Sequence, residues 1–398
     1  MRRGGRSVSG ELKGGIARRA RKSVQFARML YFDHNATHPL SPAARDAWID
    51  ATERFIGNPS SPHRLGARAE AALDDARGKL AAWLGCAPHE IVWTSGATEA
   101  SNAALFHAAT GSDGEAWISA VEHPCVIEAT RRHFPAQHEF IPVTRAGVLE
   151  LTWLADRLKH KRPALVAVMA ANNETGVLQP WDEVLALCRG HGAPFFCDAA
   201  QWIGKLPASG LGSGDLVSGC AHKFGGPQGV GFLKVPASFR PLLVGGPQEE
   251  RRRAGTENVA GVLSMIAALE ERERALASDL KGAMRDDFER RLLEALPGTQ
   301  IVGADAERLW NTVSAIMPEL PDCRQRRVVK LDKLGFAVST GSACASGKEQ
   351  TSHVLGAMGY TATEASRALR FSSGWETRAG DWDELLDGLR RAHAELAC

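Results

Sequence analysis

Hydrophobic and polar positions along residues 43–235 follow two alternating periods. Residues 67–84 place apolar side chains at the spacing of an amphipathic helix and contain good helix formers. Short apolar runs bounded by turn residues predict buried strands. The predicted strands are Glu90–Thr94, Ala116–Ala120, Phe140–Val143, Ala164–Ala171, Pro194–Cys197, Leu216–Ser218 and Val230–Val235. Strands that alternate with helices predict an α/β fold with a mostly parallel sheet of seven strands, covered on both faces.

The second half of the chain has a different pattern. Residues 259–293 form a long helical stretch rich in Ala, Leu, Glu and Arg, which we expect to link the sheet to a smaller domain of α+β character. We therefore predict a large domain at residues 43–275. The small domain comprises residues 30–42 and 276–398.

The first 29 residues form a basic leader. Residues 1–28 contain nine Lys or Arg and one acid, Glu11, with little hydrophobic periodicity, so we expect this leader to be disordered. An arginine-rich, acid-poor start is also typical of an organelle transit peptide, but it lacks the apolar core of a secretory signal. A mis-assigned start or a solvated tail is the favoured interpretation.

Composition narrows the class of protein. The 398 residues are 44% hydrophobic and 24% charged, with a formal net charge of +2, which is ordinary for a globular protein and gives no reason to expect nucleic acid as a direct partner. No apolar run approaches the roughly 20 residues of a bilayer span. The eight cysteines form no C-x-x-C pair, so neither a metal site nor a disulfide framework is expected. We predict a cytoplasmic protein.

A possible phosphate site lies at residues 91–100. These residues read as a strand, a glycine turn and a helix start. The free backbone N–H groups of such a start, with the hydroxyl of Thr98, suit an anion. The same sequence also suits an ordinary helix cap, so this motif alone decides nothing.

Asp198 follows a buried strand, where open α/β sheets bind ligands. A carboxylate there can keep the pyridine nitrogen of pyridoxal phosphate protonated, which lets the ring withdraw electrons from a substrate carbanion. Gln201 lies three residues further on and can reach the phenolic oxygen of the ring. A lone aspartate at this position is more commonly a turn or capping residue.

Lys223 and His123 also follow predicted strands. Lys223 lies among small residues and glycines, where loss of solvation lowers the pKa of the amine and frees it for Schiff-base chemistry. His123 can stack on the cofactor and transfer protons. Alone, each has a plainer interpretation as a surface lysine or a structural histidine. Together with the phosphate turn and Asp198, they indicate a pyridoxal phosphate site.

Three further motifs supply substrate chemistry. Residues 172–176 follow the strongest apolar run, and we expect their polar side chains to point into the crevice at the strand ends. Arg370 suits a substrate carboxylate because a guanidinium grips it bidentately, although a surface ion pair is equally compatible. Cys344 lies among Gly, Ser and Ala residues typical of an exposed loop, and its thiolate indicates sulfur chemistry.

These motifs resemble those of the NifS/IscS-type cysteine desulfurases, class V members of the fold-type I pyridoxal phosphate enzymes. The resemblance covers nearly everything from Tyr31 to about Leu389. Its landmarks, in order, are residues 31–37, 57–61, 94–99, 122–123, 172–176, 198–201, 222–223, 253–256, 341–344 and 370–372. It implies a fold-type I transferase, with a large domain that binds the cofactor and a small domain that carries the Cys344 loop.

The resemblance also implies residue roles. Lys223 forms the Schiff base, His123 stacks above the ring, and Cys344 accepts sulfur. The implied cofactor contacts are Ala97, Thr98 and His222 at the phosphate, Asn173 and Gln201 at the ring oxygen, Asp198 at the ring nitrogen, and Thr256 from a second subunit. Cys220 replaces a serine that usually helps bind the phosphate, which weakens or removes one contact. Asn173 and Arg370 are the implied substrate contacts.

The implied activity is conversion of L-cysteine to L-alanine, with the sulfur held as a persulfide on Cys344. The expected partners are a second copy of the chain and a protein that accepts sulfur, either an Fe–S scaffold or a thiolation enzyme. Two alternatives stay open: another class V enzyme, such as an aminotransferase, epimerase or β-lyase, and a non-enzymatic protein that binds the cofactor. Cys344 favours the desulfurase, because those other reactions need no thiol in a loop.

Overall fold

The computed structural model describes residues 29–276, 280–320, 324–341 and 351–397. Its largest sheet has seven strands in the order β2-β8-β7-β6-β5-β3-β4. The strands are β2 (Ile91–Thr94), β3 (Ala116–Ser119), β4 (His138–Ile141), β5 (Leu165–Ala167), β6 (Phe195–Asp198), β7 (Leu216–Cys220) and β8 (Gly231–Lys234). Strand β8 is antiparallel to β2 and β7, and the remaining neighbours are parallel. The predicted mostly parallel seven-stranded sheet is confirmed.

Each of the seven predicted strands differs from the observed one by at least one residue, and two of the differences have a clear physical reason. Strand β4 begins at His138, two residues before the predicted start, because its first two residues, His138 and Glu139, are polar and half-buried and so lie outside the apolar run. Strand β5 ends at Ala167, although the apolar run continues to Ala171. Residues 168–171 are buried, and Ala170 still donates its N–H to the carbonyl of Asp198. The apolar run therefore indicates which residues are buried, not where the strand ends.

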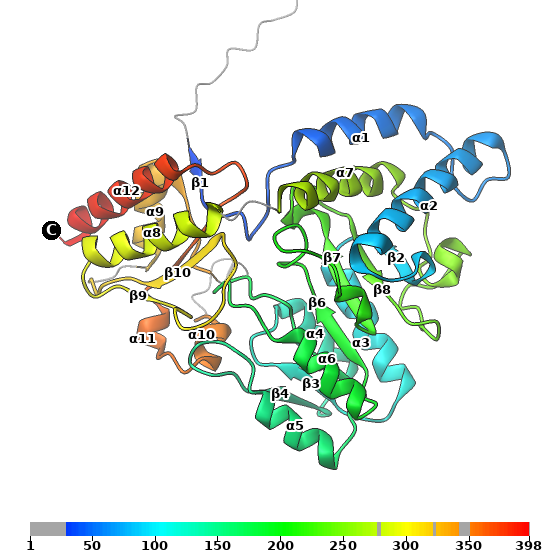
Figure 1. The fold of residues 1–398 in the computed structure, drawn as a ribbon, viewed down its shortest axis with the longest axis horizontal. Helices are drawn as coiled ribbons and strands as arrows, with labels where there is room; N and C mark the ends of the chain where they lie inside the picture. Colours follow the sequence, from blue (N-terminus) through cyan, green and yellow to red (C-terminus); the bar gives the residue numbers. More distant parts are fainter. Residues whose placement is uncertain (1–28, 277–279, 321–323, 342–350, 398) are drawn as a thin grey trace, which may run out of the picture.

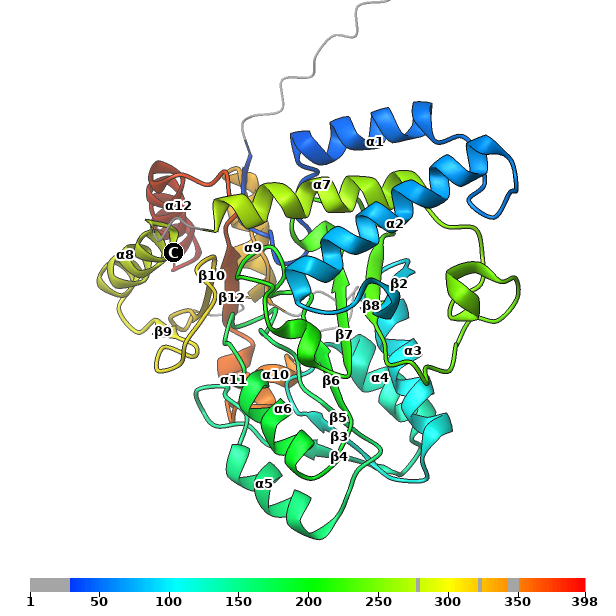
Figure 2. The same cartoon turned by 45° about the vertical axis from the view of Figure 1, so that its right-hand side comes forward.

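Helices cover both faces of this sheet (Figure 1). The helices of this part are α1 (Pro42–Arg54), α2 (Arg64–Leu84), α3 (Ala97–Gly111), α4 (Pro124–His133), α5 (Leu151–His160), α6 (Trp181–Gly190) and α7 (Val259–Ala275). Side chains of α2, α5, α6 and α7 share one hydrophobic core with the sheet, and those of α3 and α4 share another. Figure 2 shows α1, α7 and α2 lying side by side across one end of the molecule.

Local sequence explains where the predicted helix at 67–84 begins and ends. The ring of His63 accepts a hydrogen bond from the N–H of Gly66, which caps the first turn of α2. Gly85 ends the helix in the left-handed conformation, with φ of 78°, which a glycine adopts without strain. The amphipathic pattern thus located the helix body, and its caps add three residues at the N-terminal end.

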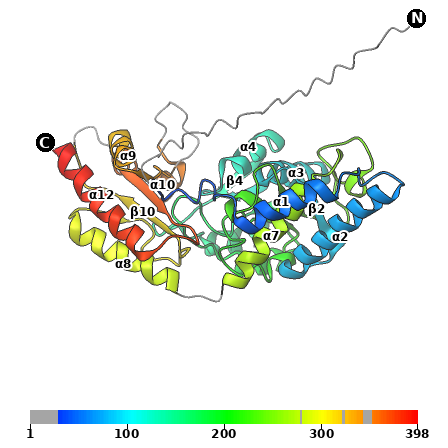
Figure 3. The ribbon, with the colours of Figure 1, turned by 90° about the horizontal axis from the view of Figure 1, so that it is seen from above.

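A second, smaller part of the molecule has its own core (Figure 3). Strands β10 (Thr312–Ile316), β12 (Ala368–Ser372) and β9 (Gln300–Ile301) form an antiparallel sheet, and β1 (Leu30–Tyr31) pairs with β11 (Phe336–Ala337). The helices here are α8 (Leu280–Ala295), α9 (Arg324–Lys333), α10 (His353–Ala357), α11 (Ala362–Ala365) and α12 (Ala379–Ala397). The predicted α+β character agrees with these elements, whereas the exact domain boundaries and the leader stay predictions.

The predicted helical stretch 259–293 comprises two helices. Helix α7 packs against α1 and α2, and α8 packs against α12. The two halves of this run of helix formers therefore pack into different hydrophobic cores. The composition of the run does not show that it divides into two helices. Within the described residues, no helix has both the length and the apolar character needed to cross a membrane.

Candidate functional site

A cavity of about 410 Å³ opens at the carboxyl ends of the central strands. This volume falls within the range of small-ligand and cofactor sites. Its lining contains most of the predicted site residues, which come from five separate sequence segments. They are Ala97, Thr98, His123, Asn173, Asp198, Gln201, Cys220, His222 and Lys223. The fold thus brings together residues up to 126 positions apart, as expected for the carboxyl edge of an open α/β sheet.

Lys223 ends a short 3₁₀ turn that directly follows β7. Its Nζ donates hydrogen bonds to the backbone carbonyls of Asn35 and Ala36, both at 2.8 Å. Burial lowers the pKa of this amine, because a charged ammonium loses solvation there. The amine is therefore held at the cavity wall and is easier to deprotonate than a surface lysine, as Schiff-base chemistry requires.

Asp198 is the last residue of β6 and is only 4% exposed. Its Oδ1 accepts hydrogen bonds from the hydroxyl of Ser218 and the N–H of Ala200, both at 3.0 Å. These donors fix the orientation of the carboxylate. A fixed anion at the cavity wall matches the pyridinium nitrogen of pyridoxal phosphate in charge.

The start of helix α3 forms an anion-binding end of the cavity. Gly96 is its N-cap residue and offers no side chain to satisfy the first backbone N–H groups. Thr98 is exposed, so its hydroxyl is accessible to a ligand. Glu99 does not compete for this end, because its carboxylate accepts hydrogen bonds from Arg253 and from the N–H of Ser95. The donors present fit a phosphate group.

Two histidines face the cavity in neutral form. Burial lowers the pKa of His123 and lowers that of His222 to about 4. His123 caps helix α4, and its Nδ1 accepts the N–H of Cys125 at 3.1 Å, which places the proton of the neutral ring on Nε2. His222 contacts the hydroxyl of Thr37 at 3.2 Å. Hydrogen bonds thus fix the tautomer of the His123 ring and the orientation of the His222 ring.

Cys220 occupies the end of β7 and is only 2% exposed. Burial raises the pKa of its thiol to about 11, so this thiol stays protonated at neutral pH. A neutral thiol is a weaker hydrogen-bond donor than the hydroxyl expected there from the family resemblance.

The two predicted substrate contacts, Asn173 and Arg370, differ in their position relative to the cavity. Asn173 lines the cavity, but Arg370 lies on β12 and does not contribute to the described lining. Its guanidinium is bonded to Asp33 at 2.6 Å and to the carbonyls of Asn173 and Gly341 at 2.8 and 3.3 Å. The neighbours of Asn173 also differ from the prediction, because Asn172 and Glu174 are buried. The side chain of Asn172 accepts the N–H of Glu174 within the turn, and the carboxylate of Glu174 accepts from the hydroxyl of Ser352.

Two predicted residues lie away from this lining. Thr256 is exposed and is not among the described residues of the cavity wall. Cys344 lies outside the described residues, although Gly341 on one side of it and Ser352 on the other are described. Their assigned roles therefore stay predictions.

The structure adds residues that the sequence did not single out. Asn35 and Lys205 are almost fully buried beside the cavity, where Lys205 bonds to both Asn35 and Gln201. Glu122 is also buried, and burial raises the pKa of its carboxyl well above the usual value. Asn35 and Glu122 lie within the landmarks 31–37 and 122–123, and Lys205 lies four residues after Gln201, but no local pattern marked any of the three as buried beside a cavity.

Comparison with known proteins assigns the family. The aminotransferase class-V family matches residues 30–385, so the chain belongs to this family. Cysteine desulfurase of Klebsiella pneumoniae is 40% identical over 371 residues, which cover 90% of this chain and 91% of that protein. Cysteine desulfurase of Rhodobacter capsulatus is 39% identical over 384 residues, covering 92% and 97%. Within the family, the chain is a cysteine desulfurase.

Solved structures agree with this assignment. A NifS-like protein superposes with a TM-score of 0.84 at 31% identity, covering 92% of this chain and all of that one. SspA in complex with cysteine gives a TM-score of 0.75 at 28% identity, covering 86% and 98%. The predicted fold-type I transferase fold, enzyme class and pyridoxal phosphate cofactor are confirmed. The cavity fits that cofactor, with donors at one end and a carboxylate and an amine along its wall.

Proposed function

We propose that this desulfurase uses Lys223, Asp198 and Cys344 to move sulfur from L-cysteine onto its own chain. The observation that carries the proposal is the shared cavity wall of Lys223, whose pKa is lowered by burial, and the fixed carboxylate of Asp198. This pair provides an amine that forms a covalent link and an anion that stabilises a protonated ring. Few other cofactors require both groups in that arrangement.

Each cavity residue has a distinct task in this proposal. The N-terminus of α3, with Thr98 and His222, holds the phosphate, and Asp198 faces the ring nitrogen. Gln201 and Asn173 contact the ring oxygen, and His123 stacks above the ring. The neutral thiol of Cys220 contributes little to phosphate binding. Bound pyridoxal phosphate supplies an electron sink for the charge that develops on the substrate α-carbon.

Protein groups carry the protons and the sulfur. The amine of Lys223 removes the proton from the α-carbon of L-cysteine, and the neutral ring of His123 supplies a nearby proton carrier. The thiolate of Cys344 then attacks the substrate sulfur: an S–S bond forms and the substrate C–S bond breaks. The electrons of that C–S bond stay with the carbon skeleton, which takes up a proton and leaves as alanine. The balance is one cysteine consumed, one alanine and one persulfide formed.

Substrate binding by Arg370 depends on its existing ion pair with Asp33. Its guanidinium is bonded to Asp33, so a substrate carboxylate would have to share it with or displace Asp33. Asn173 links the two regions, because its side chain lines the cavity and its carbonyl accepts from Arg370. This continuity supports a carboxylate site next to the cofactor cavity.

We further propose that the enzyme is a cytoplasmic homodimer that passes sulfur to an Fe–S scaffold or to a thiolation enzyme. Thr256 is exposed, and the nearby Leu243 and Val244 are 42% and 80% exposed. Apolar exposure next to a predicted phosphate contact supports a surface for a second copy. Such a dimer would bring Thr256 of one subunit to the phosphate end of the other.

The experiment is to measure alanine and persulfide formed from L-cysteine by the wild type, Lys223→Ala and Cys344→Ala. We expect Lys223→Ala to lose at least about a thousandfold in rate, because it removes both covalent attachment and proton transfer. Cys344→Ala should bind the cofactor yet form no persulfide. Cys86→Ala is the matched control: this half-buried thiol has a pKa raised by burial to about 11, and its removal should leave both products unchanged. Full activity of Cys344→Ala would disprove the proposed sulfur route.

A further inference from the structure

Lys205 is a buried amine for which the proposed chemistry has no use. It lies in the turn after Gln201 and is 4% exposed. Lysine is rarely buried so completely unless it is paired with an acid, yet the side-chain partners of Lys205 among the described residues are the amide oxygens of Asn35 and Gln201 rather than a carboxylate. Burial lowers the pKa of its amine well below the usual value. A costly group at this position calls for a specific explanation.

The contacts of Lys205 lead directly to the cofactor cavity. Its Nζ donates to Oδ1 of Asn35 at 2.8 Å and makes a second, shorter hydrogen bond to Oε1 of Gln201. A neutral amine has two N–H donors, which matches these two acceptors in number. Both acceptors are linked to Lys223 through one backbone carbonyl, because the carbonyl of Asn35 accepts from Lys223 at 2.8 Å and from Nε2 of Gln201 at 3.0 Å.

These contacts fix the orientation of the Gln201 amide. Its Nε2 donates to the carbonyl of Asn35 at 3.0 Å, and a backbone carbonyl can only accept. Lys205 selects the same orientation at the other end of the amide, because its Nζ donates to the amide oxygen, and the amide nitrogen lies at the carbonyl to which Lys223 also bonds. An amide free to rotate could present either atom to a ligand, whereas this one presents a donor.

We propose that Lys205 is a positioning residue that orients Gln201 so that its NH₂ group, rather than its oxygen, serves the ring oxygen of the cofactor. This inference rests on the proposed contact between Gln201 and that oxygen. Lys205 acts through Gln201 and Asn35 and touches neither the cofactor nor the substrate. The same contacts hold the carbonyl of Asn35 in place for Lys223, so one buried amine organises both groups.

The test is a pH titration of the visible absorbance of the cofactor-bound enzyme, with Lys205→Met against wild type. A donor at the phenolic oxygen withdraws negative charge from the neighbourhood of the nitrogen that joins Lys223 to the cofactor. Loss of that donor leaves more negative charge beside this nitrogen, so its pKa rises. We expect the midpoint to rise by about 0.5–1 pH unit and the dissociation constant for the cofactor to rise about three- to tenfold.

Two comparisons distinguish a change in the orientation of Gln201 from a general loss of stability. Lys234→Met is the matched control, because Lys234 is also a buried lysine (6% exposed), but it bonds to the carbonyl of Gly214 and pairs with Glu90 away from the cavity. It should leave the midpoint unchanged even if it lowers stability. In a Gln201→Leu background, Lys205→Met should cause no further shift, because the group that it orients is gone.

An unchanged midpoint in Lys205→Met, or an equal shift with Gln201 present and absent, would overturn the proposal. If Lys205→Met does not fold, Lys205→Gln keeps a donor at shorter reach, and its shift must have the same sign and vanish in Gln201→Leu. The measurement is independent of turnover. A wild type that binds cofactor but makes no alanine would refute the proposed function alone.

Discussion

The cofactor cavity and the seam between the two parts of the molecule are built in different ways. Most residues of the cavity wall lie at or just after the carboxyl ends of strands of the seven-stranded sheet, as Asp198 and Lys223 illustrate. The seam is held by bonds between residues far apart in the sequence, among them those of the buried Asn35, whose side chain bonds to both parts. The cavity is therefore open and locally encoded, whereas the seam is closed and depends on distant partners.

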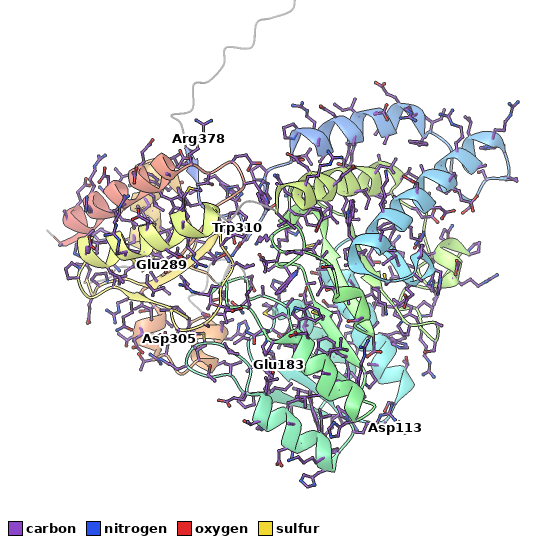
Figure 4. The ribbon with its side chains drawn as sticks, viewed as in Figure 1. Asp113, Glu183, Glu289, Asp305, Trp310 and Arg378 are labelled. Atoms are coloured by element: carbon purple, nitrogen blue, oxygen red, sulfur yellow. The ribbon has the colours of Figure 1, made fainter. Side chains whose placement is uncertain are left out.

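Polar contacts across the seam converge on a few buried groups. The side chain of Asn35 contacts Lys205 and Asn173 on the side of the large sheet, and Asn311 and Thr312 on the small sheet, at 2.8–3.1 Å. Figure 4 shows Trp310 at the same junction, and its indole N–H donates to the carbonyl of Lys205 at 3.0 Å. A change in the cavity should mainly alter ligand binding, whereas a change in the seam should alter the stability of the whole molecule.

The largest expected effect is that of Asn35→Ala. This change removes four side-chain hydrogen bonds and leaves buried partners unsatisfied, so we expect the free energy of unfolding to fall by about 3 kcal/mol or more. Urea denaturation of the cofactor-free protein measures it, because bound cofactor would add its own stabilisation. Thr98→Ala is the cavity counterpart: it changes an exposed hydroxyl and should cost less than about 0.5 kcal/mol. Equal losses in the two variants would contradict the comparison.

The second effect concerns the ion pair between Asp33 and Arg370. Arg370 is 1% exposed at its side chain and Asp33 is 25% exposed, so Asp33→Asn leaves a buried guanidinium without its anion. Because two backbone carbonyls still accept from Arg370, we expect a loss of about 2 kcal/mol, below the usual cost of breaking a buried pair. The same variant should lower the KM for L-cysteine if the substrate carboxylate competes with Asp33. A loss of stability without any change in KM would confine Arg370 to a structural role.

The same contrast explains what the sequence could predict. The strand ends carrying Asp198 and Lys223 were predictable because each follows an apolar run, so both the sheet and the chemistry of its carboxyl edge could be inferred from local patterns. The bonding of Arg370 to Asp33 was not predictable, because it joins residues 337 positions apart. The burial of Lys205 was also hidden, since lysine normally signals a surface and no local pattern marks a buried one.

The third effect is a pH dependence located in the seam, which develops only as the pH is lowered. Burial lowers the pKa of His34 to about 3, and its Nδ1 has no hydrogen-bond partner among the described residues. An unfolded histidine titrates near pH 6.5, so between pH 6.5 and 3 the unfolded chain binds a proton that the folded chain does not. The free energy of unfolding should therefore fall with decreasing pH in this window, by at most about 1.4 kcal/mol per pH unit from this residue. Below about pH 3 both states bind the proton and this loss stops.

Comparison of His34→Asn with His222→Asn tests whether this dependence belongs to the seam. The pKa of His222 is also lowered by burial, to about 4, but this ring faces the cavity. A bound phosphate would add negative charge beside it and raise its pKa, so the cofactor should reduce the acid sensitivity contributed by His222. The contribution of His34, outside the described cavity wall, should persist with and without cofactor. Denaturation curves at pH 7 and pH 5, with and without cofactor, measure the two contributions. If the cofactor changes the pH dependence of the two variants equally, the electrostatic distinction between the cavity and the seam is wrong.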